Sequence, residues 1–162
     1  IRDLPKRIRI SKTNDSTYVA DDIIFAGDIG FGIDIYDIQY KNLFNRNGVY
    51  KVELLIDSIQ KFSYSMDRIK FSENHYKKLM YDYLSLVKNN RRELKVYTPP
   101  RSNLSFLKAN GFNGIIKSDE ISDSKVNIKV TDWNNNSSYL KFKIISADSL
   151  KSNKPLNGIE IL

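Results

Sequence analysis

A strict alternation of side-chain type runs through most of residues 27–57. Apolar residues occupy every second position in two stretches, and most positions between them are small, polar or charged. The apolar positions are Ile29, Phe31, Ile33 and Ile35 in the first stretch and Tyr50, Val52, Leu54 and Ile56 in the second. A period of two is typical of half-buried β-strands, and Asn47-Gly48 is a strong turn signal. We therefore expect two long antiparallel strands, joined by a loop over about residues 37–47.

The same period recurs further along the chain. Residues 61–69 predict a third strand, which follows residues 55–59 through a short turn. A late pair is expected over residues 126–130 and 139–144, joined by a turn at residues 131–137. Shorter strands are expected near residues 8–10, 94–97, 104–107 and 114–117. Strands at such intervals predict a mainly all-β protein, an Ig-like antiparallel β-sandwich.

One segment follows a helical period instead. From Ser72 onward the apolar residues are three and four positions apart, namely Tyr76, Leu79, Met80, Tyr83, Leu84 and Val87. Ser72 suits the N-cap of a helix, and Lys88 suits its negative C-terminal end. We predict one amphipathic helix over about residues 73–88, inserted among the strands.

The length and composition suit a single domain. The chain has 162 residues, of which 41% are hydrophobic, and this is enough for a substantial core. We assign residues 1–145 to the β-sandwich with its helical insertion, and the polar residues 146–162 to a linker or the start of a following segment. The chain opens at Ile1 with neither an initiator Met nor a signal peptide, so we expect it to be a domain of a longer protein.

The charge favours anionic partners. A net charge of +7 and an isoelectric point near 9.4 suit nucleic acid, phosphate-bearing lipid or an acidic cell-wall polymer, although a composition rich in Ile, Lys and Asn also raises these values. The absence of cysteine excludes disulfides, thiolate metal sites and a cysteine nucleophile. No apolar run approaches the roughly 20 residues that a membrane-spanning helix needs, so no transmembrane segment is expected.

No sequence pattern supports catalysis. The glycines of residues 27–32 lie inside an alternating stretch with no helix after them, so we expect close approach of a backbone or an aromatic ring rather than a phosphate loop. His75 is the only histidine, which supports neither a hydrolytic zinc site nor a catalytic triad. Asp132 opens a segment like a calcium loop, but the twelfth position is Lys143 rather than Glu, which favours a plain turn. We expect no catalytic residue, no metal ligand and no cofactor.

The densest basic run is the candidate binding site. It consists of Lys88, Arg91, Arg92, Lys95 and Arg101. The run is a solvated face, a contact for an anionic polymer or a nucleic-acid platform. Nucleic acid is the least favoured, because such platforms interleave exposed aromatic rings with the charges and most aromatic residues here fall on predicted buried positions. Trp133, at a predicted turn, completes the candidate site: it either stacks on a sugar or a partner, or folds back on the sandwich.

A combination of short motifs resembles a known family. The motifs are Ile29-Gly30-Phe31-Gly32-Ile33, Tyr36-Asp37, Asn47-Gly48-Val49-Tyr50-Lys51-Val52-Glu53, Phe62-Ser63-Tyr64-Ser65-Met66-Asp67-Arg68, Phe71, Tyr81-Asp82-Tyr83, and Asp132 with Asn136. Over roughly residues 22–145 the chain resembles the β-sandwich accessory domain that follows the catalytic domain in exported lysostaphin-like zinc endopeptidases of Gram-negative bacteria. Those enzymes cleave peptidoglycan cross-bridges with a zinc held by histidines and an aspartate, and none of those ligands is present in this sequence.

The resemblance implies a non-catalytic accessory domain in the cell envelope, periplasmic or associated with the outer membrane. It would position or dock the catalytic domain of the same parent protein, a peptidoglycan endopeptidase. Two alternatives stay open. One is a module that binds peptidoglycan or another anionic envelope polymer through the basic run and Trp133. The other is a protein-interaction subunit of an envelope complex, in which exposed strand edges take a partner strand.

Overall fold

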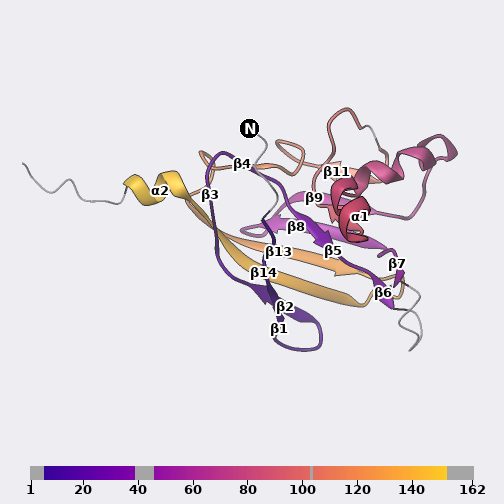
Figure 1. Ribbon diagram of the computed structural model, residues 1–162, viewed down its shortest axis with the longest axis horizontal. Coiled ribbons are helices and arrows are strands. Elements are labelled where there is room, and N and C mark those ends of the chain that lie inside the picture. Colours follow the sequence, from indigo (N-terminus) through magenta and orange to yellow (C-terminus); the bar gives the residue numbers. More distant parts are fainter. Residues whose placement is uncertain (1–5, 39–45, 103, 153–162) are drawn as a thin grey trace, which may run out of the picture.

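The computed structural model describes residues 6–38, 46–102 and 104–152, and it confirms the prediction of a mainly β protein (Figure 1). The helices are η1, a 3₁₀ helix (Phe71–Met80), and two short α-helices, α1 (Tyr83–Asn89) and α2 (Ala147–Ser152). Among the described residues, no helix has the length and apolar character needed to span a membrane.

One large sheet, the main sheet, forms the centre of the molecule. Its strand order is β1-β2-β14-β13-β8-β9-β11, and β3 also pairs with β14. The strands are β1 (Ile10–Lys12), β2 (Thr17–Ala20), β3 (Ile23–Phe25), β8 (Lys51–Ile56), β9 (Ile59–Ser65), β11 (Leu107–Ala109), β13 (Asp123–Thr131) and β14 (Ser137–Ser146). Neighbouring strands are antiparallel, except that β14 runs parallel to both β2 and β3.

Short two-stranded ladders make up the remaining β-structure of the described residues. They are β4 (Asp28–Ile29) with β12 (Ile116–Lys117), β5 (Gly32–Asp34) with β10 (Glu93–Lys95), and β6 (Asp37–Ile38) with β7 (Arg46–Asn47). The first two ladders form a second layer over one face of the main sheet. Phe31, just before β5, packs edge-on against Phe142 of β14, with the ring centroids 5.3 Å apart and the planes at 82°.

The hydrophobic core lies between the main sheet and this second layer. The alternation on β8 places Val52, Leu54 and Ile56 in the core, as its period predicts. Other elements contribute Phe31, Ile33, Phe62, Leu94, Val96, Ile116, Val126, Ile128, Phe142 and Ile144. Burial of so many large apolar side chains on one face is the main source of stability for a sheet of this kind. The other face of the main sheet stays at least partly exposed.

The predicted pairing of the two alternating stretches along their length is wrong, although β6 and β7 form a short antiparallel ladder at the ends of the predicted loop. The first stretch is divided between β4 and β5, which pair with β12 and β10, whereas β8 pairs with β9 and β13. The division falls at Gly30, where a Cβ atom would lie 2.9 Å from the Tyr97 ring, so the expected close approach of an aromatic ring is confirmed. The alternation determines which face of a sheet each side chain occupies, but it does not determine which strand will be its partner. Residues 39–45 of the predicted loop lie outside the described residues.

Two other predicted pairings are confirmed. β9 follows β8 through Asp57 and Ser58, whose φ angles of +47° and +72° suit a tight hairpin turn. β13 and β14 form the late hairpin over their full lengths. At the tip of this hairpin, the backbone N–H of Asn136 donates to the Asp132 carboxylate at 2.8 Å, so that the aspartate serves the turn itself.

The helical insertion predicted over residues 73–88 is present, but it is not one continuous helix. The chain instead forms η1 and α1, separated by two extended residues that pair with β10. Tyr81 forms a β-bridge with Leu94, and the backbone N–H of Asp82 donates to the carbonyl oxygen of Glu93 at 2.9 Å. This tertiary pairing outweighs the helical period of the sequence and divides the segment.

The predicted N-cap at Ser72 is also wrong. η1 begins after Lys70, and no side chain accepts a hydrogen bond at that cap. The capped helix is α1, where Asp82 Oδ1 accepts from the backbone N–H of Ser85 at 2.7 Å. A carboxylate at this position satisfies a helix N–H group that otherwise lacks a partner.

The described part of the predicted linker continues the fold. β14 extends to Ser146, which is buried, and α2 follows at once. The hydroxyl of Ser149 donates to the carbonyl oxygen of Ser122 at 3.1 Å, which ties the first turn of α2 to the residue before β13. Residues 153–162 of the predicted linker lie outside the described residues.

Candidate functional site

Three of the five predicted basic residues gather at the C-terminal end of α1. Lys88 is exposed in the last turn of the helix. Asn90 ends the helix in a left-handed conformation with φ of +51°, and the exposed Arg91 and Arg92 follow it. The cationic side chains lie where the helix dipole is negative, which is a favourable place for them whether or not a ligand binds.

The other two basic residues lie on different elements. Lys95 belongs to β10 and is half-buried, and its Nζ donates to the carbonyl oxygen of Leu79 at 3.0 Å. This ammonium group therefore helps to hold the end of η1. Arg101 is exposed in a turn after Pro99 and Pro100, with φ of +61°.

Trp133 combines features of both interpretations offered by the sequence. It lies in the turn between β13 and β14, and 71% of it is exposed. Its ring packs edge-on against Tyr50, with centroids 5.0 Å apart and planes at 85°. The Tyr50 hydroxyl in turn donates to the Asp67 carboxylate, which raises the pKa of the tyrosine. The tryptophan is thus oriented by a neighbouring ring while most of its surface remains open.

Seven of the exposed large apolar residues among the described ones lie on η1 and α1. We call this set the helical surface, and it consists of Phe71, Tyr76, Leu79, Tyr83, Leu84, Leu86 and Val87. Of the apolar positions that predicted the helix, only Met80 is buried. Phe71 is 90% exposed and Val87 is 62% exposed, so the apolar face of this insertion is left without a covering element in the described structure.

Polar contacts attach the insertion to the rest of the fold. The Ser85 hydroxyl donates to Glu93 of β10 at 2.7 Å, and the Ser105 hydroxyl donates to Glu73 of η1 at 2.7 Å. Met80 supplies the one buried apolar side chain of the two helices. The insertion is therefore fixed from one side, and its apolar residues are held outward.

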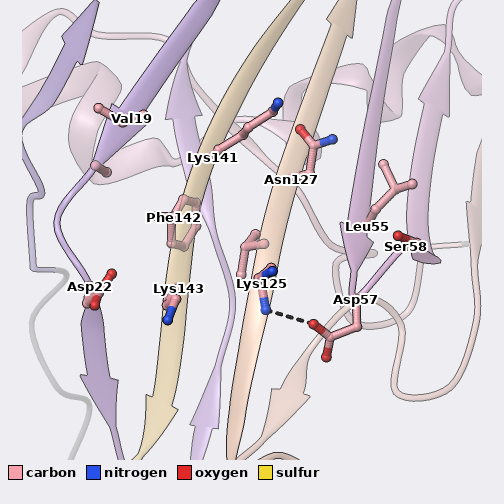
Figure 2. A pocket seen from close by; sticks show the side chains of 12 residues that line it. Val19, Asp22, Leu55, Asp57, Ser58, Lys125, Asn127, Lys141, Phe142 and Lys143 are labelled. Atoms are coloured by element: carbon pink, nitrogen blue, oxygen red, sulfur yellow. Dashed lines mark hydrogen bonds between the residues drawn. The ribbon is translucent and has the colours of Figure 1, made fainter. Parts of the chain in front are cut away.

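A second candidate region lies on the exposed face of the main sheet. It is a shallow groove of about 490 Å³, lined by residues of β2, β8, β13 and β14 (Figure 2). We call it the lysine groove and define it by Lys125 and Asn127 of β13, Lys141 and Lys143 of β14, and Leu55 at its wall. Figure 2 shows Asn127 beside Lys141, with Lys125 and Lys143 further along the same strands.

Positive charge in the lysine groove is concentrated by the strand register. Lys125 and Lys143 are direct cross-strand partners, an arrangement in which like charges destabilise a sheet. Among the described residues, no carboxylate forms an ion pair with Lys125, Lys141 or Lys143. Asp57 is nearby, but its carboxylate accepts from the backbone N–H of Lys125 at 2.8 Å rather than from the ammonium group.

Asn127 adds an unsatisfied polar atom to the same region. Its Oδ1 is buried and has no hydrogen-bond partner. The residue lies between Leu55 of β8 and Lys141 of β14 in the register of the sheet. A buried acceptor without a donor costs free energy, and most such atoms in folded proteins are paired.

Comparison with protein-family models, with curated proteins and with solved structures finds no match for this chain. Within the described ranges, no group of three or more His, Cys, Asp or Glu side chains is placed to hold a metal ion. Function is therefore inferred from the helical surface, the lysine groove and the resemblance stated above.

Sequence reasoning missed both regions. The lysines of the groove alternate along β13 and β14, and that signal was present in the sequence at residues 125, 141 and 143. Their convergence depends on the register of the hairpin, which places Lys125 opposite Lys143. The helical surface was mistaken for a buried face, because an amphipathic period is the same whether the core or a partner covers it.

Acidification is expected to destabilise the fold. The backbone N–H of Lys125 lowers the pKa of Asp57 below its ordinary value of 3.8, and the hydroxyl of Tyr50 lowers the pKa of Asp67 in the same way. A carboxyl whose pKa is lower in the folded state adds stability above its unfolded pKa, and that stability is lost as the pH falls through the folded pKa. Urea unfolding at a series of acid pH values should show this loss, and Asp57→Asn should make the decline shallower. A free energy of unfolding that is flat or rising below pH 3.8 contradicts the assignment.

Proposed function

We propose that this chain is a non-catalytic accessory domain of a cell-envelope peptidoglycan endopeptidase, and that it positions or docks the catalytic domain of the same parent protein. The helical surface is the observation that carries the proposal. It consists of seven large apolar side chains that are exposed on the two neighbouring helices η1 and α1. The resemblance of the sequence motifs to accessory domains of lysostaphin-like endopeptidases supports the choice of partner and of compartment.

An exposed apolar region of this kind favours contact with another protein surface. Water around large apolar side chains makes their exposure unfavourable, and contiguous patches on soluble domains commonly mark interaction sites. Tyr83, Leu84 and Val87 are exposed apolar residues of α1, and the exposed cations Lys88 and Arg91 lie at the C-terminal end of the same helix. An apolar centre with a polar rim is the usual composition of an interface.

A partner in the same polypeptide suits a surface made of two short helices. Two separate proteins lose translational and rotational freedom when they associate, and this loss opposes binding. Domains joined by a linker meet at a high effective concentration, so a smaller contact is enough to hold them together. The helical surface therefore suits a neighbouring domain better than a freely diffusing partner.

The test compares variants of the full-length parent polypeptide in the digestion of purified peptidoglycan sacculi. Tyr83→Lys and Val87→Lys place a charge in the helical surface, and each is expected to lower muropeptide release about fivefold because the docked interface is disrupted. Ile59→Lys is the matched control, since Ile59 is 63% exposed at the start of β9, outside the helical surface. Melting curves of the isolated chain should be the same for all three variants, because the substituted side chains are exposed.

Three outcomes contradict the proposal. One is release of muropeptides by the isolated chain, which excludes a non-catalytic role. Another is equal activity of the helical-surface variants and the control, which excludes docking through η1 and α1. The third is a parent polypeptide that encodes no zinc-ligand motifs before Ile1, which removes the catalytic domain itself.

A further inference from the structure

We propose that the lysine groove binds an acidic oligosaccharide, through ammonium groups that engage its carboxylates and an asparagine oxygen that accepts from one of its hydroxyls. The groove lies on the exposed face of the main sheet, whereas η1 and α1 attach to β10 in the second layer. The inference is therefore independent of the docking role and is carried by different residues.

The charge of the groove favours an anionic ligand, because three lysines line it against two aspartates, Asp22 and Asp57. Lys125 and Lys143 face each other directly across β13 and β14, and Lys141 follows two residues along on the same face. Two residues of a strand cover about 7 Å, so the positive charges are repeated along the groove rather than gathered at a single point. Like charges held in direct opposition destabilise the apo sheet, and a bound carboxylate between them relieves that repulsion.

The unpartnered oxygen of Asn127 indicates a ligand that also carries hydrogen-bond donors. A fully ionised phosphate or sulfate offers only acceptors, so it satisfies the lysines and leaves this atom unpaired. A sugar hydroxyl donates as well as accepts, and it supplies the missing bond to Asn127 Oδ1. Lys141 lies opposite Asn127 in the register and is exposed, so a carboxylate held by its ammonium group brings the hydroxyls of the same ligand next to Asn127.

The lining of the groove favours sugars over nucleic acid. Single-stranded nucleic acid is held largely by stacking of bases on exposed aromatic rings. Among the residues that line the groove, the one aromatic residue is Phe142, and its ring packs against Phe31 in the core. Val19 and Leu55 are aliphatic lining residues, and the carboxylates of Asp22 and Asp57 offer further acceptors for hydroxyls (Figure 2).

Calorimetric titration of the chain with oligogalacturonate, a carboxylate-bearing sugar polymer, tests the proposal. Binding is expected, and it should weaken as salt is added because the contacts are largely ionic. Lys141→Gln and Lys143→Gln should each weaken binding about tenfold, as should Asn127→Leu. Lys108→Gln is the matched control: it removes one exposed lysine from β11, at the edge of the main sheet.

The same variants separate a lost ligand contact from a damaged fold. Lys143→Gln removes one of two opposed positive charges, so its melting temperature should equal or exceed that of the parent chain while its affinity falls. A Lys143→Gln variant that binds as tightly as Lys108→Gln overturns the proposal.

Three further ligands identify the chemistry that is recognised. A neutral cello-oligosaccharide should not bind, and inorganic polyphosphate should bind more weakly than oligogalacturonate, with no effect of Asn127→Leu. Binding of polyphosphate at equal or higher affinity overturns the requirement for hydroxyls. Tighter binding of single-stranded DNA, lost in Lys143→Gln, overturns the assignment of the groove to sugars.

Discussion

Replacing Phe62 by alanine is expected to lower the free energy of unfolding by about 4 kcal/mol. Phe62 is fully buried, with 0% of its surface exposed, and it lies opposite Leu54 in the β8–β9 pair. It also lies beneath the second layer, since its Cβ would be 3.1 Å from a Cβ added at Gly114. Truncation therefore removes apolar contacts to both layers and leaves a cavity that the surrounding sheet can close only in part.

Phe71→Ala is the matched control for this prediction. It makes the same chemical change, but Phe71 is 90% exposed at the start of η1. Urea unfolding followed by tyrosine and tryptophan fluorescence should show a change of about 0.5 kcal/mol or less for this variant. Similar losses for the two phenylalanines contradict the placement of the core between the main sheet and the second layer.

Much of the sheet could be predicted from local pattern. The alternation at Val52, Leu54 and Ile56 identified the buried face of β8, and the late alternation identified β13 and β14 as a pair. Patterns of this kind depend on neighbouring residues of the chain and on the burial of one face.

The partner of the first alternating stretch could not be predicted in this way. β5 pairs with β10, some sixty residues later in the chain, because Gly30 admits the ring of Tyr97 and allows the ladder to change partner. A pattern of period two contains no information about a contact so distant in sequence. The division of the predicted helix has the same cause, since Tyr81 bridges Leu94 of the same β10 strand.

The candidate sites differ in how far the sequence reveals them. Lys88, Arg91 and Arg92 were identified by their density in the sequence, and they lie exposed at one end of α1. The lysine groove can be recognised only when the cross-strand register is known, because Lys125 and Lys143 are eighteen residues apart along the chain but are direct partners in the sheet. A binding surface on a sheet is therefore found from pairing, whereas one on a short helix is found from composition.

Gly114→Ala is expected to lower the free energy of unfolding by about 3 kcal/mol. Gly114 has φ of +82°, a conformation that L-residues with a side chain seldom adopt. A Cβ there would also lie 3.1 Å from Phe62 Cβ and from Tyr97 Cα, and 3.2 Å from the Val96 carbonyl oxygen. Two of these three neighbours are backbone atoms, so they cannot rotate away, and the second layer must move from the main sheet to make room.

Gly111→Ala separates the two contributions to this loss. Gly111 has a similar φ of +69°, but a Cβ there would meet no atom within 4 Å, so only the backbone strain of about 1 kcal/mol is expected. The difference between the two variants in urea unfolding measures the contact between Gly114 and the core. Because Val96 follows β10 directly and β10 holds η1 and α1, Gly114→Ala should also increase amide hydrogen exchange in those helices, whereas Gly111→Ala should not. Equal losses of stability for the Gly114→Ala and Gly111→Ala variants would show that the second layer does not pack against Phe62.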